Sequence, residues 1–121
     1  MGRKVLLVED DKNTIIVVKM ALEAHLYEVT VAEDGVAAME QAFNLEPDVI
    51  LLDLLVPKLD GSMVLEGLKK ADKTCNIPVV VISAKAADED IRKARDLGAE
   101  EYLVKPFTPE ELLATVVRFL P

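Results

Sequence analysis

The stretch Val49-Ile50-Leu51-Leu52-Asp53, near the middle of the chain, joins four consecutive apolar residues to a carboxylate. A strand exposed on one face would alternate apolar with polar residues, so an unbroken apolar run predicts a strand covered on both faces, as in a parallel sheet. Val5–Val8 and Val79–Ile82 have the same character, and Glu28–Ala32 and Glu101–Val104 predict weaker strands at or near the edges. The chain therefore contains five predicted strands.

Apolar residues recur at helical spacing after each of the first four strands, which predicts amphipathic helices. These residues are Ile15, Val18 and Leu22; Val36, Met39 and Phe43; Val64, Leu65 and Leu68; and Ile91, Ala94 and Leu97. A last helix is predicted after Thr108-Pro109, a cap residue followed by proline at the first helical position. Its apolar residues are Leu112, Leu113, Val116, Val117 and Leu120. Five strands alternating with five helices predict an open, doubly wound α/β sheet with helices on both faces.

Length and composition limit the functions that the chain can have. Its 121 residues make one domain, 1–121, without an internal linker or repeat, and we expect either a single-domain protein or one part of a longer one. The net charge of -8 disfavours direct binding to nucleic acid or to anionic membranes. The single cysteine, Cys75, excludes an internal disulfide, and the run Val5–Val8 is too short to cross a membrane. We expect a cytoplasmic protein.

Polar groups follow four of the predicted strands. Glu9-Asp10-Asp11 follows the first strand, Asp53 the third, Ser83-Ala84 the fourth and Lys105-Pro106 the fifth. In an open parallel sheet, ligands bind beyond the carboxyl ends of the strands, at the point where strand order reverses. We therefore expect these side chains to form one site. Two simpler interpretations stay open, namely that the acids after the first strand cap the next helix and that Lys105 forms a plain ion pair.

A carboxylate at Asp53, directly after a buried strand, is costly to desolvate unless it has a partner or a cation. Converging carboxylates repel one another, and Mg²⁺ relieves this repulsion with a sparse set of oxygen ligands. Lys105 and the Ser83 hydroxyl would then bind the oxygens of a transferring phosphoryl group while the carboxylate acts as nucleophile. The pattern predicts a magnesium-dependent phosphoryl acceptor.

Four motifs, in this order along the chain, resemble the receiver domain of two-component response regulators, and in particular the chemotaxis-regulator-like single receiver domains. They are Lys4-Val5-Leu6-Leu7-Val8-Glu9-Asp10-Asp11, Asp53-Leu54-Leu55-Val56-Pro57-Lys58-Leu59-Asp60-Gly61, Val81-Ile82-Ser83-Ala84 and Tyr102-Leu103-Val104-Lys105-Pro106-Phe107. The resemblance covers essentially the whole chain. It implies a flavodoxin-like parallel sheet with strand order 2-1-3-4-5, and a cis peptide bond between Lys105 and Pro106.

By this resemblance, Asp53 is the phosphorylation site and Mg²⁺, for which Mn²⁺ can substitute, is the cofactor. The metal-binding groups would be Asp10, Asp53, the backbone carbonyl of Leu55 and, through water, Glu9. The residues that bind the phosphoryl group or respond to it would be Ser83, Ala84, Lys105 and Tyr102, with Tyr102 turning inward on phosphorylation. A histidine kinase or a histidine phosphotransfer protein would be the donor. The altered fourth helix, fifth strand and fifth helix would control an unidentified downstream protein.

Some residues depart from the common pattern of these receivers or add to it. Leu55 and Lys85 stand where relatives control the entry of water, and we expect the apolar Leu55 to slow hydrolysis of the phosphoryl group. The first predicted helix also carries Ile16, Val17 and Met20, more apolar residues than one buried face requires. We expect these three to help dock the donor, although a fully covered helix would explain them equally well. The winged-helix transcription-factor branch of these regulators often dimerises through charges on the fourth and fifth helices. Thr115 stands where those relatives carry arginine, so this dimer is not supported and the oligomeric state stays open.

Two other functions remain as alternatives. A pseudo-receiver would keep the fold as a protein-interaction module without phosphorylation, which the set Asp10, Asp53, Ser83 and Lys105 disfavours. A phosphatase that forms an aspartyl phosphate would need a second acid two residues after the nucleophile, where this chain has Leu55. We expect a protein that assists its own phosphorylation and slow dephosphorylation and is not a turnover enzyme.

Overall fold

The computed structural model describes residues 2–120 and contains the five expected strands, so only Met1 and Pro121 of the predicted domain lie outside it. The strands are β1 (Lys4–Val8), β2 (Glu28–Ala32), β3 (Val49–Asp53), β4 (Val79–Ser83) and β5 (Glu101–Val104). The helices are α1 (Lys12–Glu23), α2 (Gly35–Leu45), α3 (Gly61–Lys70), α4 (Asp88–Asp96) and α5 (Pro109–Val116), followed by the short 3₁₀ turn η1 (Val117–Phe119). Each predicted strand lies within one residue of its observed bounds at both ends.

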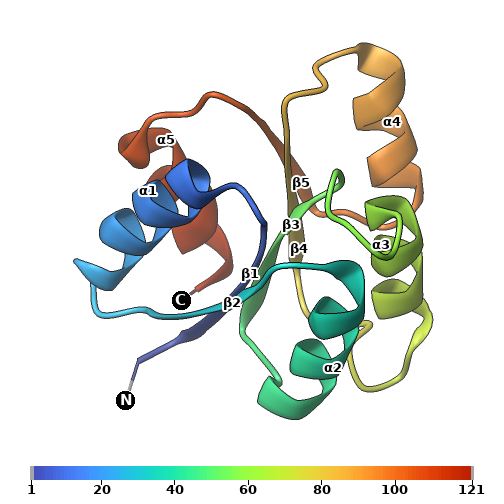
Figure 1. The fold of residues 1–121 in the computed structure, drawn as a ribbon, viewed down its shortest axis with the longest axis horizontal. Helices are drawn as coiled ribbons and strands as arrows, with labels where there is room; N and C mark the ends of the chain where they lie inside the picture. Colours follow the sequence, from blue (N-terminus) through green and yellow to red (C-terminus); the bar gives the residue numbers. More distant parts are fainter. Residues whose placement is uncertain (1, 121) are drawn as a thin grey trace.

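The strands form one parallel sheet in the order β2-β1-β3-β4-β5 (Figure 1). This order confirms the predicted doubly wound topology and places the two weaker strands, β2 and β5, at the edges. From β1 the chain moves outward to β2 and then returns across β1 to begin β3. The direction of winding therefore reverses between β1 and β3, and a ligand site is expected beyond the carboxyl ends of these two strands.

Two hydrophobic layers cover the sheet because successive side chains of a strand point to opposite faces. On one face, Val5, Leu7 and Leu51 pack with residues of α1 and α5. On the other face, Leu6 and Leu52 pack with residues of α2, α3 and α4. All of these strand residues are fully buried, which explains the unbroken apolar runs in the sequence. Strand ends are thereby held rigidly, and with them the side chains that follow.

The predicted apolar stripe of α2 is partly wrong. Val36 and Phe43 are exposed, whereas Ala38 and Ala42 form the buried face and Met39 is half-buried beside them. Residues four positions apart lie on one helical face, and two alanines there let the helix backbone approach the sheet closely. Large apolar residues were therefore a poor guide to the buried face of this helix.

Candidate functional site

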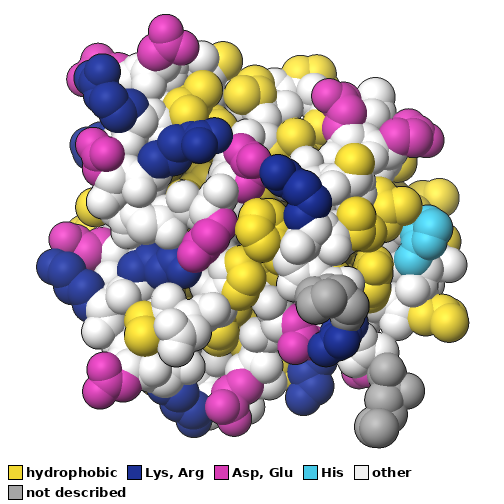
Figure 2. Space-filling model, turned by 180° about the vertical axis from the view of Figure 1, so that it is seen from behind, with side chains coloured by type: hydrophobic (Ala, Val, Ile, Leu, Met, Phe, Trp, Pro, Cys, Tyr) yellow, Lys and Arg dark blue, Asp and Glu magenta, His cyan; other side chains and the backbone are white. Residues whose placement is uncertain are grey.

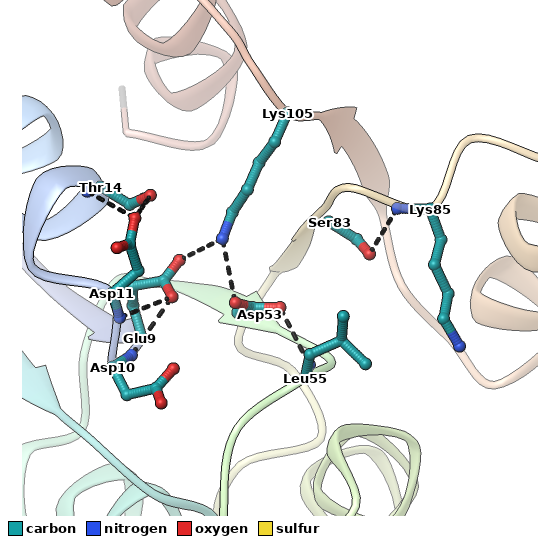
Figure 3. A network of polar contacts seen from close by, with 9 residues as sticks. All are labelled: Glu9, Asp10, Asp11, Thr14, Asp53, Leu55, Ser83, Lys85 and Lys105. Carbon is teal, nitrogen blue, oxygen red and sulfur yellow. Dashed lines mark hydrogen bonds and ion pairs between the residues drawn. The ribbon is translucent and has the colours of Figure 1, made fainter.

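Three carboxylates converge at the carboxyl ends of β1 and β3 (Figure 3). Val8 pairs with Leu52 in the sheet, so the residues that follow them, Glu9 and Asp53, lie side by side. With Asp10 they place three carboxylate oxygens within 4.8 Å of one another. Glu9 is fully buried and Asp53 is 5% exposed, whereas Asp10 is open to solvent. The sheet thus builds the expected acidic cluster at the point where its winding reverses.

Lys105 reaches into this cluster from the end of β5. Its Nζ donates to Oε1 of Glu9 at 2.7 Å and to Oδ2 of Asp53 at 3.0 Å. The Lys105–Pro106 peptide bond is cis, as the resemblance implied. Burial lowers the pKa of the Lys105 ammonium, but the hydrogen bonds to Glu9 and Asp53 outweigh it, so its pKa lies above the usual value. The ammonium therefore stays charged between two carboxylates. Lys105 does form ion pairs, as the simpler interpretation expected, and it forms them inside the acidic cluster.

Glu9 is the most strongly perturbed acid in this cluster. Burial raises the pKa of the Glu9 carboxyl most, the neighbouring Asp53 adds to this, the contact with Lys105 opposes both, and the resulting pKa is about 7. Its Oε2 also accepts the backbone N–H groups of Asp10 and Asp11, at 3.2 and 3.1 Å. A single ammonium therefore does not balance the negative charge that the fold gathers here. Such a carboxylate cluster suits a hard divalent cation with oxygen ligands.

Asp11 belongs to the following helix and not to the acidic cluster. It is the N-cap of α1, where its Oδ2 accepts the backbone N–H of Thr14 at 3.1 Å and the Thr14 hydroxyl at 2.7 Å. The helix-capping interpretation of the three acids after β1 is therefore correct for Asp11. Glu9 and Asp10 take part in the cluster.

Ser83 and Tyr102 are linked through the backbone of Lys85. The Ser83 hydroxyl, fully buried at the end of β4, accepts the N–H of Lys85 at 3.1 Å. The Tyr102 hydroxyl donates to the carbonyl oxygen of the same residue at 2.8 Å. The Tyr102 ring is buried, which is the inward orientation that the resemblance assigns to the phosphorylated domain. One turn of the β4–α4 loop thus joins the predicted phosphoryl-binding hydroxyl to the predicted switch residue.

The remaining predicted residues surround this site. The N–H of Leu55 donates to Oδ1 of Asp53 at 2.9 Å, while its side chain is 56% exposed. The side chains of Ala84 and Lys85 are also exposed. Ala84 lines a groove with Lys105, and this groove extends to Val17 on α1. Leu55 and Lys85 therefore present exposed side chains next to Asp53 and Ser83, and their control of water stays a prediction.

On α1 the apolar residues outside the core stripe are not fully covered. Ile16 is exposed, Met20 is 70% exposed, and Val17 is half-buried. Figure 2 shows hydrophobic side chains gathered on the part of the molecule that carries α1 and α5. The alternative of a fully covered helix is therefore wrong.

Sequence reasoning missed two residues that touch the loop after Asp53. The N–H of Gly35, the first residue of α2, donates to the carbonyl of Pro57 at 3.0 Å. Asp34, the N-cap of that helix, forms an ion pair with Lys58 at 3.4 Å. Only the pair Asp34-Gly35 at a helix start could have signalled this contact, and that pair is common at helix starts for capping alone.

A sequence profile described as the response regulator receiver domain matches residues 5–117. This chain belongs to that family. Among curated proteins, this receiver domain is 39% identical over 113 residues to RpaA of Synechocystis sp., a DNA-binding transcriptional regulator, with 93% of this chain and 47% of RpaA covered. The chain spans about half the length of the curated relatives it matches.

Solved receiver structures have the same fold. CheY4 of Vibrio cholerae, a chemotaxis response regulator, superposes with a TM-score of 0.92 at 30% identity, covering 98% of this chain and 99% of CheY4. The receiver domain of the sensor histidine kinase PA1611 of Pseudomonas aeruginosa gives 0.91 at 30% identity, covering 99% and 98%. That structure holds a magnesium ion in its active-site cleft. In residues 2–120 of the present chain, no helix is long and apolar enough to cross a membrane.

Proposed function

We propose that this receiver domain is a phosphoacceptor switch that takes a phosphoryl group from a phosphohistidine onto Asp53. The supporting observation is the placement of the buried Asp53 carboxylate 3.0 Å from the Lys105 ammonium, beside Glu9 and at the open end of the sheet. A carboxylate oxygen of Asp53 attacks phosphorus, the P–N bond of the donor breaks, and the departing imidazole keeps the electron pair and takes up a proton. Lys105 and the Ser83 hydroxyl neutralise and hydrogen-bond the phosphoryl oxygens.

Mg²⁺ is the proposed cofactor, and the residues present fit it. The carboxylates of Asp10 and Asp53 and the backbone carbonyl of Leu55 would hold it, and Glu9 would act through water. These are hard oxygen donors around a cluster whose negative charge Lys105 alone does not balance. When bound, the cation supplies positive charge beside the phosphoryl oxygens. Mn²⁺ shares the preference for oxygen ligands and should substitute.

The proposed output depends on the link between Ser83 and Tyr102. Phosphorylation of Asp53 draws the Ser83 hydroxyl toward the phosphoryl group, so the hydroxyl releases the Lys85 N–H that it now accepts. Because Tyr102 is bonded to the carbonyl of the same Lys85, this change reaches β5 and α4. A separate downstream protein, or a further part of a longer protein, reads the altered surface. The single Cys75 and the absence of a disulfide among the described residues suit a reducing compartment, and we propose that the domain works in the cytoplasm.

A histidine kinase or a histidine phosphotransfer protein is the proposed donor, and we expect it to contact the exposed side of α1. Met20→Lys and Val17→Lys should slow phosphotransfer from the cognate donor, because each places a charge in an apolar contact. Phosphorylation by acetyl phosphate should be unchanged, since the small donor needs no docking surface. Unaltered phosphotransfer in both folded variants would remove α1 from the donor contact.

The lifetime of the phosphoryl group should depend on Leu55. Leu55→Asn replaces an exposed apolar side chain at the entrance of the site with an amide that can orient an attacking water. We expect dephosphorylation to accelerate by roughly tenfold, within the range for positioned polar groups. The decay of the acyl phosphate after removal of free donor measures this, and equal lifetimes for the two proteins would contradict it.

Incubation with acetyl phosphate, with and without Mg²⁺, tests the proposed function. We expect one acid-stable and hydroxylamine-sensitive phosphoryl group, mapped to Asp53 by mass spectrometry, and no modification when a chelator removes the cation. No modification and no binding of a beryllofluoride mimic would support a pseudo-receiver. Multiple turnovers on several phosphate esters would support a phosphatase.

A further inference from the structure

The loop that follows Asp53 rests on the first turn of α2. Pro57, in the middle of this loop, accepts the Gly35 N–H at 3.0 Å, and Lys58 reaches Asp34. Lys58 also has a positive φ of 74°, which marks a sharp bend at this contact. The Lys58 side chain of the Lys58–Asp34 pair is largely exposed, so this ion pair by itself contributes little to stability. The contact with Gly35 is therefore the main tie between the loop and α2.

Gly35 is needed for the space that it leaves and not for its backbone conformation. A Cβ atom at this position would lie 2.4 Å from Cβ of Leu59 and 3.1 Å from its Cα and N. Among the described glycines only Gly98 has a positive φ, so the backbone of Gly35 would accept alanine. Alanine would also favour the helix, by up to about 1 kcal/mol in a helix interior. Glycine at this position thus gives up helix propensity and allows the loop to pack against the helix.

The other end of the same loop is fixed in a similar way. The Gly61 N–H donates to the carbonyl of Leu54 at 3.2 Å, and a Cβ on Gly61 would lie 2.3 Å from Cα of Leu54. The Leu55 N–H is held on Asp53. The backbone of Leu55, whose carbonyl is the proposed metal ligand, therefore lies in a loop tied to Asp53, to α3 and to Gly35.

We propose that Gly35 is a positioning residue for the metal site, because it lets the loop from Leu54 to Asp60 settle where Leu55, whose carbonyl is the proposed metal ligand, is held beside Asp53. This inference rests on the proposed function, since it concerns the same metal site. Gly35 acts through Pro57 and Leu59 and touches neither the cation nor the phosphoryl group. Its effect is to set the cation affinity of a site whose carboxylates lie on other elements.

Gly35→Ala should raise the dissociation constant for Mg²⁺ roughly tenfold, the lower end of the range for residues that support metal ligands. Calorimetric titration of the full chain with Mg²⁺ measures this, and the melting temperature without Mg²⁺ shows whether the fold is kept. Gly67→Ala is the matched control. It makes the same change inside α3, where a Cβ would meet only the flexible end of Met39 at 3.3 Å. Its Mg²⁺ affinity should equal that of wild type.

A second change should rescue the first. Leu59→Gly removes the Cβ that an alanine at position 35 would meet, so Gly35→Ala with Leu59→Gly should bind Mg²⁺ more tightly than Gly35→Ala alone. Equal dissociation constants for wild type and Gly35→Ala would overturn the positioning role while leaving the proposed function intact. No Mg²⁺ binding by wild type would overturn both.

Hydrogen exchange in wild type tests the positioning role of Gly35 without a substitution. It therefore still applies if Gly35→Ala does not fold. If the loop couples the cation to Gly35, saturating Mg²⁺ should slow exchange of the Gly35 amide, because coupling between two sites is reciprocal. The Cys75 amide, bonded to the Ala71 carbonyl in the turns that follow α3, is the control and should be unaffected. An unchanged Gly35 exchange rate would count against the positioning role.

Discussion

Asp53→Asn should abolish stable phosphorylation of the chain while leaving the domain folded. The amide is nearly isosteric with the carboxylate and keeps an oxygen to accept the Leu55 N–H, so the free energy of unfolding should change by only about 1 kcal/mol. An amide oxygen is a poor nucleophile toward phosphorus, and the substitution also removes one of the three converging carboxylates. Intact-mass measurement after incubation with acetyl phosphate and Mg²⁺ should show no added phosphoryl group.

Asp60→Asn is the matched control for this experiment. Asp60 lies in the same loop but is exposed and caps α3 by accepting the Ser62 N–H at 2.8 Å, a role that asparagine can also fill. Its phosphorylation should equal that of wild type. A phosphoryl group that still appears on Asp53→Asn, for instance on Asp10, would show that the acidic cluster accepts phosphate without Asp53 as the dedicated nucleophile.

The position of the site could be predicted from the sequence because it depends on strand ends. A fully buried strand leaves an unbroken apolar run in the sequence, as at Val49–Leu52. The residue after each such run must lie where the carboxyl ends of the parallel strands meet. The prediction that Glu9, Asp53 and Lys105 lie in one site is therefore confirmed, although these residues are far apart in the chain. The spacing of short motifs was enough to predict the site, because pairing in the sheet fixes where each strand ends.

Contacts that depend on side-chain packing were not predictable in the same way. The buried face of α2 consists of Ala38 and Ala42, and hydrophobicity alone favoured the larger Val36 and Phe43. The contact of Gly35 with the loop after Asp53 joins two segments through backbone atoms, and the residue types alone do not say which segments meet. The same holds for the bond from Tyr102 to the Lys85 carbonyl. These features follow from close packing of elements, which a pattern of residue types does not record.

Lys105→Met should lower both the stability of the domain and its rate of phosphorylation. Methionine replaces the apolar stem but not the ammonium, which leaves Glu9 and Asp53 without their shared cation in a site where the lysine side chain is only 19% exposed. We expect the free energy of unfolding without divalent cations to fall by about 2 kcal/mol, less than for a fully buried pair. Phosphorylation by acetyl phosphate should slow on the order of a hundredfold, as for loss of one group that stabilises transition-state charge.

Mg²⁺ should restore much of the stability of Lys105→Met, because a bound cation replaces part of the missing positive charge and binds only the folded site. Thermal unfolding with and without Mg²⁺ measures this. Lys69→Met is the matched control, since Lys69 is 11% exposed and donates to Glu100 at 2.8 Å and to the Ile77 carbonyl at 2.9 Å, at the opposite end of the sheet. That variant should also lose stability, but Mg²⁺ should not restore it and phosphorylation should be normal. Equal recovery of both variants would mean that Mg²⁺ acts on the domain as a whole and not through the acidic cluster beside Asp53.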